Sequence, residues 1–283
     1  MKRKVIKSFL IFLSIFILLL LCGIYITFEN TELQLSNYEI INNKIPTEFN
    51  DFKIVQISDF HNEKSKRLTN MLINEIKNQK PNIIVITGDL IDSRRTNISV
   101  SIDFIKQIEK IAPIYYVTGN HESRINYNDI KEKLIENKVI VLDNKTEILK
   151  LGNSCINLIG IDDPNILHRK SISDKTIINE ELNNANYDKN NYSILLSHRP
   201  EVFDTYRENK LDLVLTGHAH GGQIRLPFFG GMIAPNQGLF PKYTCGKFEE
   251  KETTMIISRG IGNSIFPFRI NNRPELVIIN LKM

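Results

Sequence analysis

The chain has 283 residues, of which 42% are hydrophobic and 24% charged, so it is long enough for a large folded domain and is not intrinsically disordered. Its formal net charge is +4 at pH 7. Lys2, Arg3, Lys4 and Lys7 supply all of this excess, and the remaining residues are neutral overall. A neutral body has no strong attraction for phosphate backbones, so we expect no nucleic-acid partner.

Residues 9–28 form an apolar segment without a charged side chain. About 20 apolar residues match the hydrocarbon thickness of a bilayer. Basic residues precede the segment, and Glu29 and Glu32 follow it, which favours a cytoplasmic amino end. The sequence therefore predicts a single-pass protein of the cell membrane, with a cytoplasmic tail (1–8), an anchor (9–28) and an extracytoplasmic body.

Two alternatives for the N-terminal segment remain open. A cleaved signal peptide would have a similar apolar stretch, but no small-x-small cleavage site follows this one. The letters LLLLC resemble a lipoprotein box ending at Cys22, although Leu21 stands where such boxes have a small residue. Cys155 and Cys245 have no C-x-x-C spacing, so neither a thiolate metal site nor a disulfide framework is indicated.

Residues 29–50 are expected to form a connection and an edge strand, followed by a single domain over 51–283. Strands at 53–61, 82–90 and 114–122 alternate with helices at 71–80 and 98–111, a pattern that predicts an α/β fold with a mostly parallel sheet. Residues 139–163 are expected to add hairpins, and residues 179–191 to end a helix in a solvated loop. Further strands are predicted at 192–198, 211–220, 253–260 and 274–283.

Five predicted strands end in turns that carry histidine, aspartate or asparagine. Sheets of this type bind ligands at the carboxyl ends of their strands, so these turns are expected to converge. Five of the six histidines lie in them, and His168 receives no role. The candidates are Asp59 and His61 in ISDFH, Asp89 and Asp92 in TGDLID, Asn120 and His121 in TGNHE, His198 in LLSHRP, and His218 and His220 in LTGHAH.

Imidazole, carboxylate and amide ligands suit manganese, zinc, iron or nickel, whereas calcium prefers oxygen ligands alone. The candidates are too many for one ion that must keep a water. Two divalent ions that share a carboxylate fit better, because such a pair can ionise a bridging water and hold a phosphoryl group.

The ordered set D-x-H, G-D-x-x-D, G-N-H-E, H and G-H-x-H resembles the calcineurin-like metallophosphoesterases, over about residues 50–283. The resemblance implies a four-layer α/β/β/α sandwich of two mixed sheets. It also implies one metal on Asp59, His61 and His220, a second on Asn120, His198 and His218, and Asp89 as the bridge. His121 would face the substrate as general acid or charge stabiliser. Asp92 would orient it, unless Asp92 serves as a helix N-cap.

The blocks TGHAHGGQI and SRGIGNS, together with the apolar N-terminal segment, are similar to a membrane-anchored bacterial branch of that family. Its members are described as phosphodiesterases or, by analogy, as hydrolases of a UDP-diacylglucosamine pyrophosphate bond. This implies hydrolysis of a phosphodiester, phosphomonoester or pyrophosphate bond by metal-bound hydroxide, in a small-molecule or lipid substrate. A non-catalytic metal-binding scaffold for a protein partner, and a nucleotide or protein phosphatase of the same fold, are the alternatives.

Two further regions are candidates for substrate contact. Residues 225–243 combine apolar side chains with glycines and prolines, and could either contact the membrane or a lipid tail, or pack on themselves. Guanidinium groups match phosphate geometry. In many phosphatases of the family an arginine directly follows the orienting aspartate, but here Ser93 intervenes. The candidate arginines, which could instead be solvated surface groups, are Arg94, Arg259, Arg269 and Arg273. The sequence gives no sign of the oligomeric state.

Overall fold

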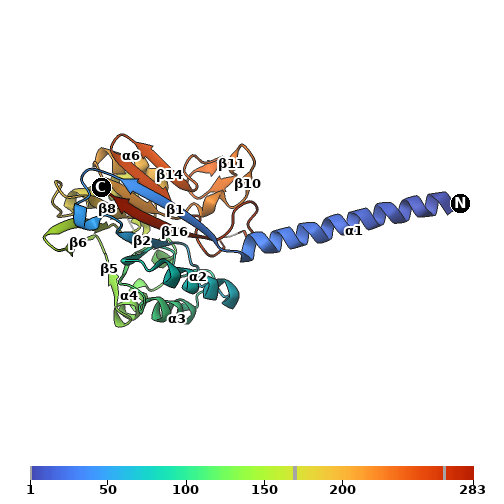
Figure 1. The fold of residues 1–283 in the computed structure, drawn as a ribbon, viewed down its shortest axis with the longest axis horizontal. Coiled ribbons are helices and arrows are strands. Elements are labelled where there is room, and N and C mark those ends of the chain that lie inside the picture. Colours follow the sequence, from blue (N-terminus) through green and yellow to red (C-terminus); the bar gives the residue numbers. More distant parts are fainter. Residues whose placement is uncertain (1, 168–170, 264–265) are drawn as a thin grey trace.

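The computed structural model describes residues 2–167, 171–263 and 266–283, so His168 lies outside the described residues. Helix α1 (Lys2–Thr31) projects from the body as a long rod (Figure 1). Within Ile6–Thr31, an 18-residue window has a mean hydropathy of 3.0, and none of that window is buried in the body. Within the described residues this is the one helix long and apolar enough to cross a membrane, and a signal sequence would have the same properties.

The first sheet has the strand order β1–β16–β2–β3–β4–β5. It is mixed, because β16 is antiparallel to β2 while the other neighbours are parallel. Its strands are β1 (Gln34–Ile41), β16 (Glu275–Lys282), β2 (Lys53–Ile57), β3 (Ile83–Thr87), β4 (Ile114–Val117) and β5 (Val139–Val141). The parallel connections run through α2 (Lys66–Gln79), α3 (Ile98–Ile108) and α4 (Tyr127–Glu136).

The second sheet has the order β14–β15–β9–β8–β7–β6 and is also mixed, with antiparallel pairs at both edges. Its strands are β14 (Gly246–Glu250), β15 (Thr253–Ile257), β9 (Leu213–Thr216), β8 (Ser193–Leu196), β7 (Ser154–Gly160) and β6 (Lys145–Leu151). Helices α5 (Asp174–Asn184) and α6 (Phe203–Glu208) cover its outer face. The predicted hairpin at 139–163 is confirmed by β6 and β7.

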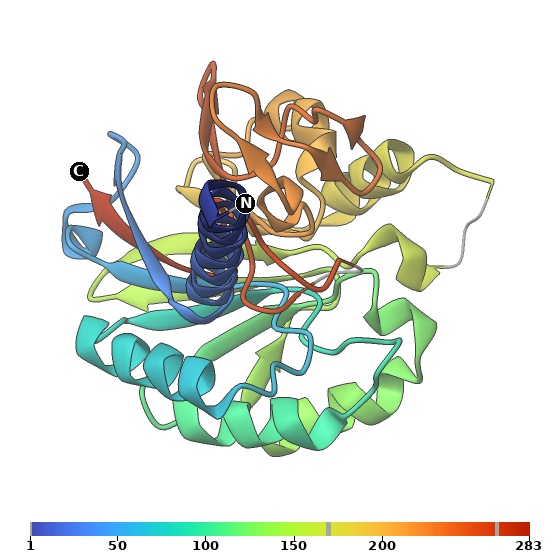
Figure 2. The same cartoon turned by 90° about the vertical axis from the view of Figure 1, so that its right-hand side faces the viewer.

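The two sheets pack face to face between two layers of helices (Figure 2). Ile54 and Val85 of the first sheet pack against Leu215 and Ile256 of the second in one buried cluster. Val55 alternates with Ile54 and faces the α2–α4 layer instead. Strands buried on both faces explain the near-continuous apolar runs of the sequence. The four-layer α/β/β/α sandwich is therefore confirmed.

Local sequence signals fix the ends of α2. The Ser65 hydroxyl caps the first turn by accepting a hydrogen bond from the Leu68 amide at 3.2 Å. The helix ends at Gln79, and the next residue, Lys80, has a left-handed conformation. Leu68, Leu72 and Ile76 form its buried stripe.

Several short elements were not predicted. Residues 225–239 form two small hairpins, from β10 (Arg225–Leu226) and β11 (Gly230–Gly231), and from β12 (Ile233–Ala234) and β13 (Gly238–Leu239). Five short 3-10 helices connect other elements in the described part of the chain, and three of them, η2, η4 and η5, begin in the turns that carry histidines. They are η1 (Thr47–Phe49), η2 (Glu122–Arg124), η3 (Pro164–Leu167), η4 (Pro200–Val202) and η5 (His220–Gly222).

Candidate metal centre

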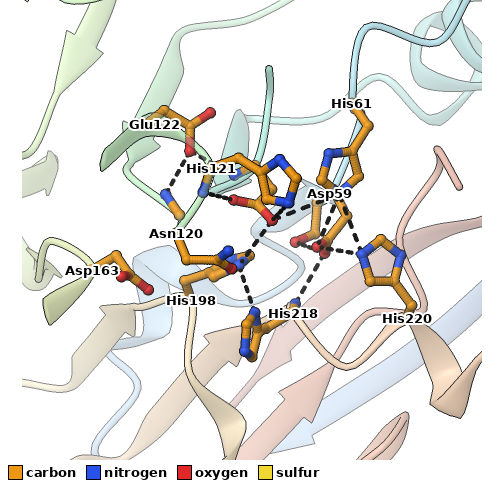
Figure 3. Close-up of polar contacts among 12 residues, drawn as sticks. Asp59, His61, Asn120, His121, Glu122, Asp163, His198, His218 and His220 are labelled. Carbon is orange, nitrogen blue, oxygen red and sulfur yellow. Dashed lines mark hydrogen bonds and ion pairs between the residues drawn. The ribbon is translucent and has the colours of Figure 1, made fainter. Parts of the chain in front are cut away.

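The carboxyl ends of β2, β3 and β4 in the first sheet meet those of β8 and β9 in the second (Figure 3). The structure brings together the side chains of all five predicted turns, and each of them is buried. They are Asp59, His61, Asp89, Asp92, Asn120, His121, His198, His218 and His220.

The first group of candidate ligands contains Asp59, His61, Asp89 and His220, whose ligand atoms lie within 4.8 Å of one another. His220 Nε2 is 3.2 Å from His61 Nε2 and 3.3 Å from Asp59 Oδ1. His61 Nε2 is 3.6 Å from Asp89 Oδ2. Two donors held about 2.1 Å from one ion are themselves roughly 3 to 3.5 Å apart. These spacings fit a single divalent ion.

The second group contains Asp89, His198 and His218. His198 Nε2 is 3.4 Å from Asp89 Oδ2 and 3.1 Å from His218 Nδ1. His198 Nδ1 faces the Thr87 carbonyl at 2.8 Å, which leaves Nε2 for an ion. Asn120 Oδ1 is buried without a hydrogen-bond partner, as is Asp59 Oδ1 in the first group. Unpartnered buried oxygens beside converging imidazoles fit bound cations.

Asp89 belongs to both groups, which is the arrangement required of a bridging carboxylate. Its Oδ1 accepts a hydrogen bond from the His121 amide at 2.8 Å, so the carboxylate is fixed in orientation. The donor set combines imidazole nitrogens with carboxylate and amide oxygens, which suits borderline divalent metals. The buried clusters therefore fit a dinuclear metal site.

The backbone is unusual at the same positions. Asp59, His61, Asp89, His218 and His220 have φ values of 50°, 49°, 51°, 67° and 46°, respectively. Non-glycine residues rarely adopt this left-handed region, and each costs about 1 kcal/mol or more. Such strain clusters at functional sites, where the fold enforces the direction of each side chain.

Two glycines make room for the central carboxylates. A Cβ atom at Gly217 would lie 2.4 Å from Asp59 Oδ2, and one at Gly119 would lie 2.3 Å from Asp89 Oδ1. Asp59 Oδ2 also accepts hydrogen bonds from the Ser58 hydroxyl at 2.6 Å and the His218 amide at 3.0 Å. The glycines of the TGN and TGH motifs are therefore required by close packing against the carboxylates.

Burial sets the charge of the imidazoles. It lowers the pKa of His61 to about 3 and holds the pKa values of His218 and His220 well below the usual range. Burial also raises the pKa of Asp59 to about 6. Burial opposes the charge of His198, but neighbouring Asp89 outweighs it and raises the pKa of His198 to about 10. Three neutral imidazoles are thus available as ligands, and the negative charge of Asp89 attracts a cation.

His121 has different surroundings. Its Nδ1 lies 3.1 Å from the Ser93 amide, which donates to it, and 3.3 Å from Asp92 Oδ1. Its Nε2 is 4.0 Å from Asp89 Oδ2, farther than the nitrogens of His61 and His198. Burial lowers the pKa of His121. With Nδ1 accepting from an amide, the neutral ring carries its proton on Nε2, the nitrogen nearer the two groups.

Asp92 does not cap a helix, because α3 begins at Ile98 with Asn97 at its N-cap position. That alternative is therefore wrong. Asp92 instead lies beside His121 and pairs with Arg94, whose Nε is 3.0 Å from Asp92 Oδ1. Burial opposes the charge of Asp92, but the hydrogen bonds from Arg94 outweigh it and lower the pKa of Asp92.

The remaining candidate arginines are engaged by other parts of the protein. Arg259 faces Glu275, with 3.7 Å between Nε and Oε1, and Arg273 stacks on the ring of Phe28 at 5.5 Å. Arg269 is fully buried, and its guanidinium donates to the carbonyls of Arg259, Asn272 and Gly262. This enclosed position gives a phosphate no access to Arg269, although Arg269 lies near His220 and Asp59. Arg94 is the candidate arginine beside His121.

Glu122 was missed as a functional residue, although it stands in the quoted motif TGNHE. It is fully buried and accepts hydrogen bonds from the amides of Asp89 (3.1 Å), Ile91 (3.1 Å) and Gly119 (2.8 Å). Burial, followed by the charge of Asp89, raises its pKa to about 7. Glu122 therefore joins the turns after β3 and β4, and only its place in the motif could have indicated this.

Asn272 was also missed. Its side-chain amide donates to the carbonyls of His220 (2.7 Å) and Gln223 (3.1 Å), and it packs directly on Gly221. The contact holds the left-handed turn that carries His220. No motif in the sequence connects the two segments, which lie far apart in the chain.

The model of the family "Calcineurin-like phosphoesterase" matches residues 52–222, more than half of the chain. The uncharacterized metallophosphoesterase YkuE of Bacillus subtilis (strain 168) is 29% identical over 256 residues, covering 88% of this chain and 86% of YkuE. The uncharacterized metallophosphoesterase Cj0846 of Campylobacter jejuni is 31% identical over 287 residues, covering 99% and 70%. Phosphodiesterase YaeI of Escherichia coli (strain K12) is 27% identical over 237 residues, covering 81% and 82%.

Among solved structures, the protein TT1561 of Thermus thermophilus has a similar fold, with a TM-score of 0.50 and 11% identity, covering 74% of this chain and 89% of that one. This likeness concerns the fold alone. The family match, the relatives and the buried aspartate and histidine clusters agree with one another. The chain belongs to the calcineurin-like metallophosphoesterase family and is a hydrolase of phosphoester bonds.

Proposed function

We propose that this protein is a membrane-anchored phosphodiesterase or pyrophosphatase with two divalent ions, acting on a lipid-linked phosphate. The observation that carries the proposal is the sharing of Asp89 by two buried ligand groups. In this assignment Asp59, His61 and His220 hold one ion. Asn120, His198 and His218 hold the other.

The pair of ions, which could be manganese, zinc, iron or nickel, would lower the pKa of a water and neutralise charge on the phosphoryl oxygens. His121 would act on the substrate from beside the ions. Its Nε2 would donate a proton to the leaving oxygen or a hydrogen bond to the phosphoryl group. Asp92, 3.3 Å from Nδ1, would orient the ring when it is protonated, whereas the Ser93 amide at 3.1 Å donates to Nδ1 of the neutral ring.

Arg94 is the arginine that we assign to the substrate. Its pairing with Asp92 holds the guanidinium beside His121. Although Ser93 separates it from the aspartate in sequence, Arg94 folds back on the Asp92 carboxylate, so the insertion does not remove it from the site. Arg259 would pair with Glu275 in the body, and Arg273 would stack on Phe28 at the base of α1.

Three features support a lipid phosphate as substrate. The exposed apolar α1 is suited to anchor the chain, a relative over most of its length is named a phosphodiesterase, and apolar hairpins follow His220 directly. The hydrolysis of a UDP-diacylglucosamine-type pyrophosphate is one such reaction. A nucleotide or protein phosphatase would not need the apolar hairpins, and a scaffold would not need the full ligand set.

We place residues 1–8 in the cytoplasm, the anchor at 9–28, the connection at 29–50 and the phosphoesterase domain at 51–283. The basic residues before the anchor and the acidic residues after it support this orientation.

The proposal is tested with Asp89→Asn in the full-length, manganese-loaded protein, purified in detergent and assayed on an aryl phosphodiester. An amide cannot bridge two cations as a carboxylate does, so turnover should fall more than about 100-fold. Asp103→Asn is the matched control, because Asp103 lies on α3 with 71% of its side chain exposed. Full activity in Asp89→Asn, or an equal loss in Asp103→Asn, would contradict the proposal.

A further inference from the structure

An apolar surface lies beside the base of α1. Its six side chains, here called the aromatic patch, come from the hairpins β10–β13 and from the segment that precedes β16. Phe228 is fully exposed, and Phe229 and Leu239 are 73% and 69% exposed. The patch consists of Phe228, Phe229, Leu239, Phe240, Phe266 and Phe268. Large exposed aromatic clusters of this kind mark an interaction surface, because a packed loop would bury them.

Two side chains of the patch lie on strained backbone. Phe228 and Phe240 have φ values of 71° and 51°, in the left-handed region where turns normally place glycine or asparagine. Phe229 and Phe240 lie near each other across the two hairpins, with ring centroids 6.4 Å apart. Phenylalanine in this conformation, at the tip of the β10–β11 hairpin and directly after β13, exposes apolar area to the surroundings.

The two segments that carry the patch are bonded to each other although they lie far apart in the chain. The Gln223 side chain donates to the carbonyls of Phe266 and Phe268 at 3.1 and 3.2 Å. Ile224 and Ile270 form a parallel β-bridge between the same segments. The hairpins and the 266–270 segment are therefore held together directly beyond His220.

The base of α1 is attached to this unit. The Tyr25 hydroxyl donates to Asn271 Oδ1 at 2.5 Å, and the Asn271 amide donates to the Arg225 carbonyl at 3.0 Å. The Asn30 side chain exchanges two hydrogen bonds with the backbone of Arg269, at 2.9 and 3.1 Å. Helix α1 is thus joined to the patch by several bonds and is not a loose tether.

A buried acid strengthens the junction. Glu29 is only 7% exposed, and its carboxylate accepts a hydrogen bond from the Asn272 amide at 2.6 Å. A carboxylate in the last turn of a helix is opposed by the helix dipole, so its position has another cause. Glu29 fixes the segment that carries both the patch and Asn272, and Asn272 in turn holds the turn of His220.

The level of the bilayer follows from these contacts. The uncharged segment 9–28 is about 30 Å long as a helix, which matches the hydrocarbon layer. Tyr25 lies three residues before its end, so the body contacts α1 about 5 Å inside the outer boundary of that layer. Figure 1 shows β10 and β11 on the side of the body from which α1 leaves, and Figure 2, viewed along the helix, shows the hairpins beside it.

We propose that the aromatic patch inserts into the outer interface of the bilayer that α1 crosses, so that the body rests on the membrane with the turn of His220 on the side of the lipid headgroups. This inference rests on the proposed membrane anchor and deepens the proposed function, because it names the lipid surface as the source of substrate. The partner of the patch is a bilayer, because the apolar helix that is joined to the patch is itself suited to cross a bilayer.

The chain contains no tryptophan, so a single introduced tryptophan is a unique fluorescent probe. The full-length protein would be placed in nanodiscs of phosphatidylethanolamine and phosphatidylglycerol, with and without brominated acyl chains. Phe229→Trp and Phe240→Trp report on the patch. Phe16→Trp, in the middle of α1, is the positive control. Ile135→Trp, 54% exposed on α4 away from the base of α1, is the negative control.

We expect brominated lipids to quench most of the emission of Phe229→Trp, Phe240→Trp and Phe16→Trp, and to leave Ile135→Trp unchanged. Quenching of Phe16→Trp alone would overturn the docking of the patch while the anchor stands. If the tryptophans of the patch are shielded from water but are not quenched by brominated lipid, the patch binds a protein partner or a second copy of the chain, and the docking on the bilayer is overturned. An unquenched Phe16→Trp would overturn the anchor and the docking together.

The same discs separate this inference from the proposed catalysis. Wild-type protein would be assayed in them on a soluble aryl phosphodiester, while the quenching is read from the tryptophan variants. Quenching without hydrolysis would contradict the catalytic proposal and leave the docking intact. Hydrolysis without quenching would contradict the docking and leave the catalytic proposal intact.

Discussion

His121 is distinguished from the other histidines of the site by what its two nitrogens face. Nδ1 is occupied by the Ser93 amide and Asp92, whereas Nε2 points toward Asp89 from 4.0 Å. Although His61, Asp92 and His121 form a third group of possible ligands, the Ser93 amide donates to Nδ1, the nitrogen of His121 that faces Asp92. This geometry favours a role toward the substrate.

For His121→Ala we therefore expect both metals to stay bound while turnover falls by roughly 10²- to 10⁴-fold, the usual contribution of a general acid. Elemental analysis gives the metal content, and an aryl phosphodiester gives the rate. His61→Ala is the comparison, because it should lose metal as well as activity. Loss of metal from His121→Ala would mean that the residue is a ligand.

Asp162 is a buried acid outside the ligand groups, and it predicts a pH dependence of stability. Its Oδ1 accepts a hydrogen bond from the Thr118 hydroxyl at 2.9 Å. Burial, followed by the charge of Asp143, raises its pKa from 3.8 to about 7. Between these pH values the folded protein binds more protons than the unfolded chain. This group therefore lowers the free energy of unfolding as pH rises from about 4 to about 7.

Asp162→Asn keeps an acceptor for Thr118 without the buried charge. The variant should be more stable than wild type by about 1–2 kcal/mol at pH 8 and close to it at pH 4, measured by denaturant unfolding in detergent. The neighbour Asp163 is the control, because Asp163→Asn breaks its ion pair with buried Arg199 and should destabilise at both pH values. A variant Asp162→Asn that is less stable than wild type at pH 8 would refute the assignment.

At the scale of elements, the turn η5 (His220–Gly222) depends on a residue that is distant in sequence. Asn272 donates to the carbonyls at both ends of this turn, and His220 holds a left-handed φ of 46°. Removal of these bonds lets the turn relax and moves the imidazole away from its partners. The support is of the kind that tunes metal sites through groups beyond the ligands.

We expect Asn272→Ala to weaken metal binding by roughly 10- to 100-fold in a metal titration of the full-length protein. Asn271→Ala is the matched control: it removes the adjacent amide and its bonds to Tyr25 and Arg225, but no bond to η5. Equal affinities in the two variants would show that Asn272 does not position His220.

The elements that could be predicted are those with local signals. The apolar runs and helical spacing of residues 53–122 correctly gave β2, α2, β3, α3 and β4. The position of β16 between β1 and β2 could not be predicted, because strand pairing depends on the whole fold. The two-residue strands of β10–β13 are too short to show alternation.

The candidate site was predictable in the same way. Polar residues directly after apolar strands mark the ligand turns, and all five of these turns converge. Glu122 and Asn272 act through backbone atoms of distant segments, which no local pattern encodes. Arg269 was predicted either to bind phosphate or to lie on the solvated surface, because arginines are rarely buried. Only the tertiary structure brings together the carbonyls that enclose it.

At the scale of the whole molecule, the site exists because two sheets meet along their strand ends. Gln56 joins them, since its buried amide donates to Thr87 Oγ1 (3.1 Å) in the first sheet and to the Thr216 carbonyl (2.8 Å) in the second. The first sheet supplies Asp59 and Asp89, and the second supplies His198 and His218. The group of Asp59, His61, Asp89 and His220 and the group of Asp89, His198 and His218 each draw on both sheets.

The proposed orientation in the membrane is a property of the whole chain. A phosphatase reporter that is active only outside the cytoplasm, fused after Met283, should be active in cells, and a cytoplasmic reporter at the same site should be silent. The reason is the charge difference across the anchor. The reverse pattern would place the body in the cytoplasm.

The most direct test of the central claim is an electron paramagnetic resonance measurement on the full-length protein loaded with manganese. Two ions bridged by Asp89 should give a spin-coupled spectrum at a stoichiometry of two ions per chain, because bridged ions lie only about 3.5–4 Å apart. In Asp89→Asn that coupled signal should disappear. A single uncoupled manganese signal in the wild-type protein would contradict the dinuclear centre and the function proposed from it.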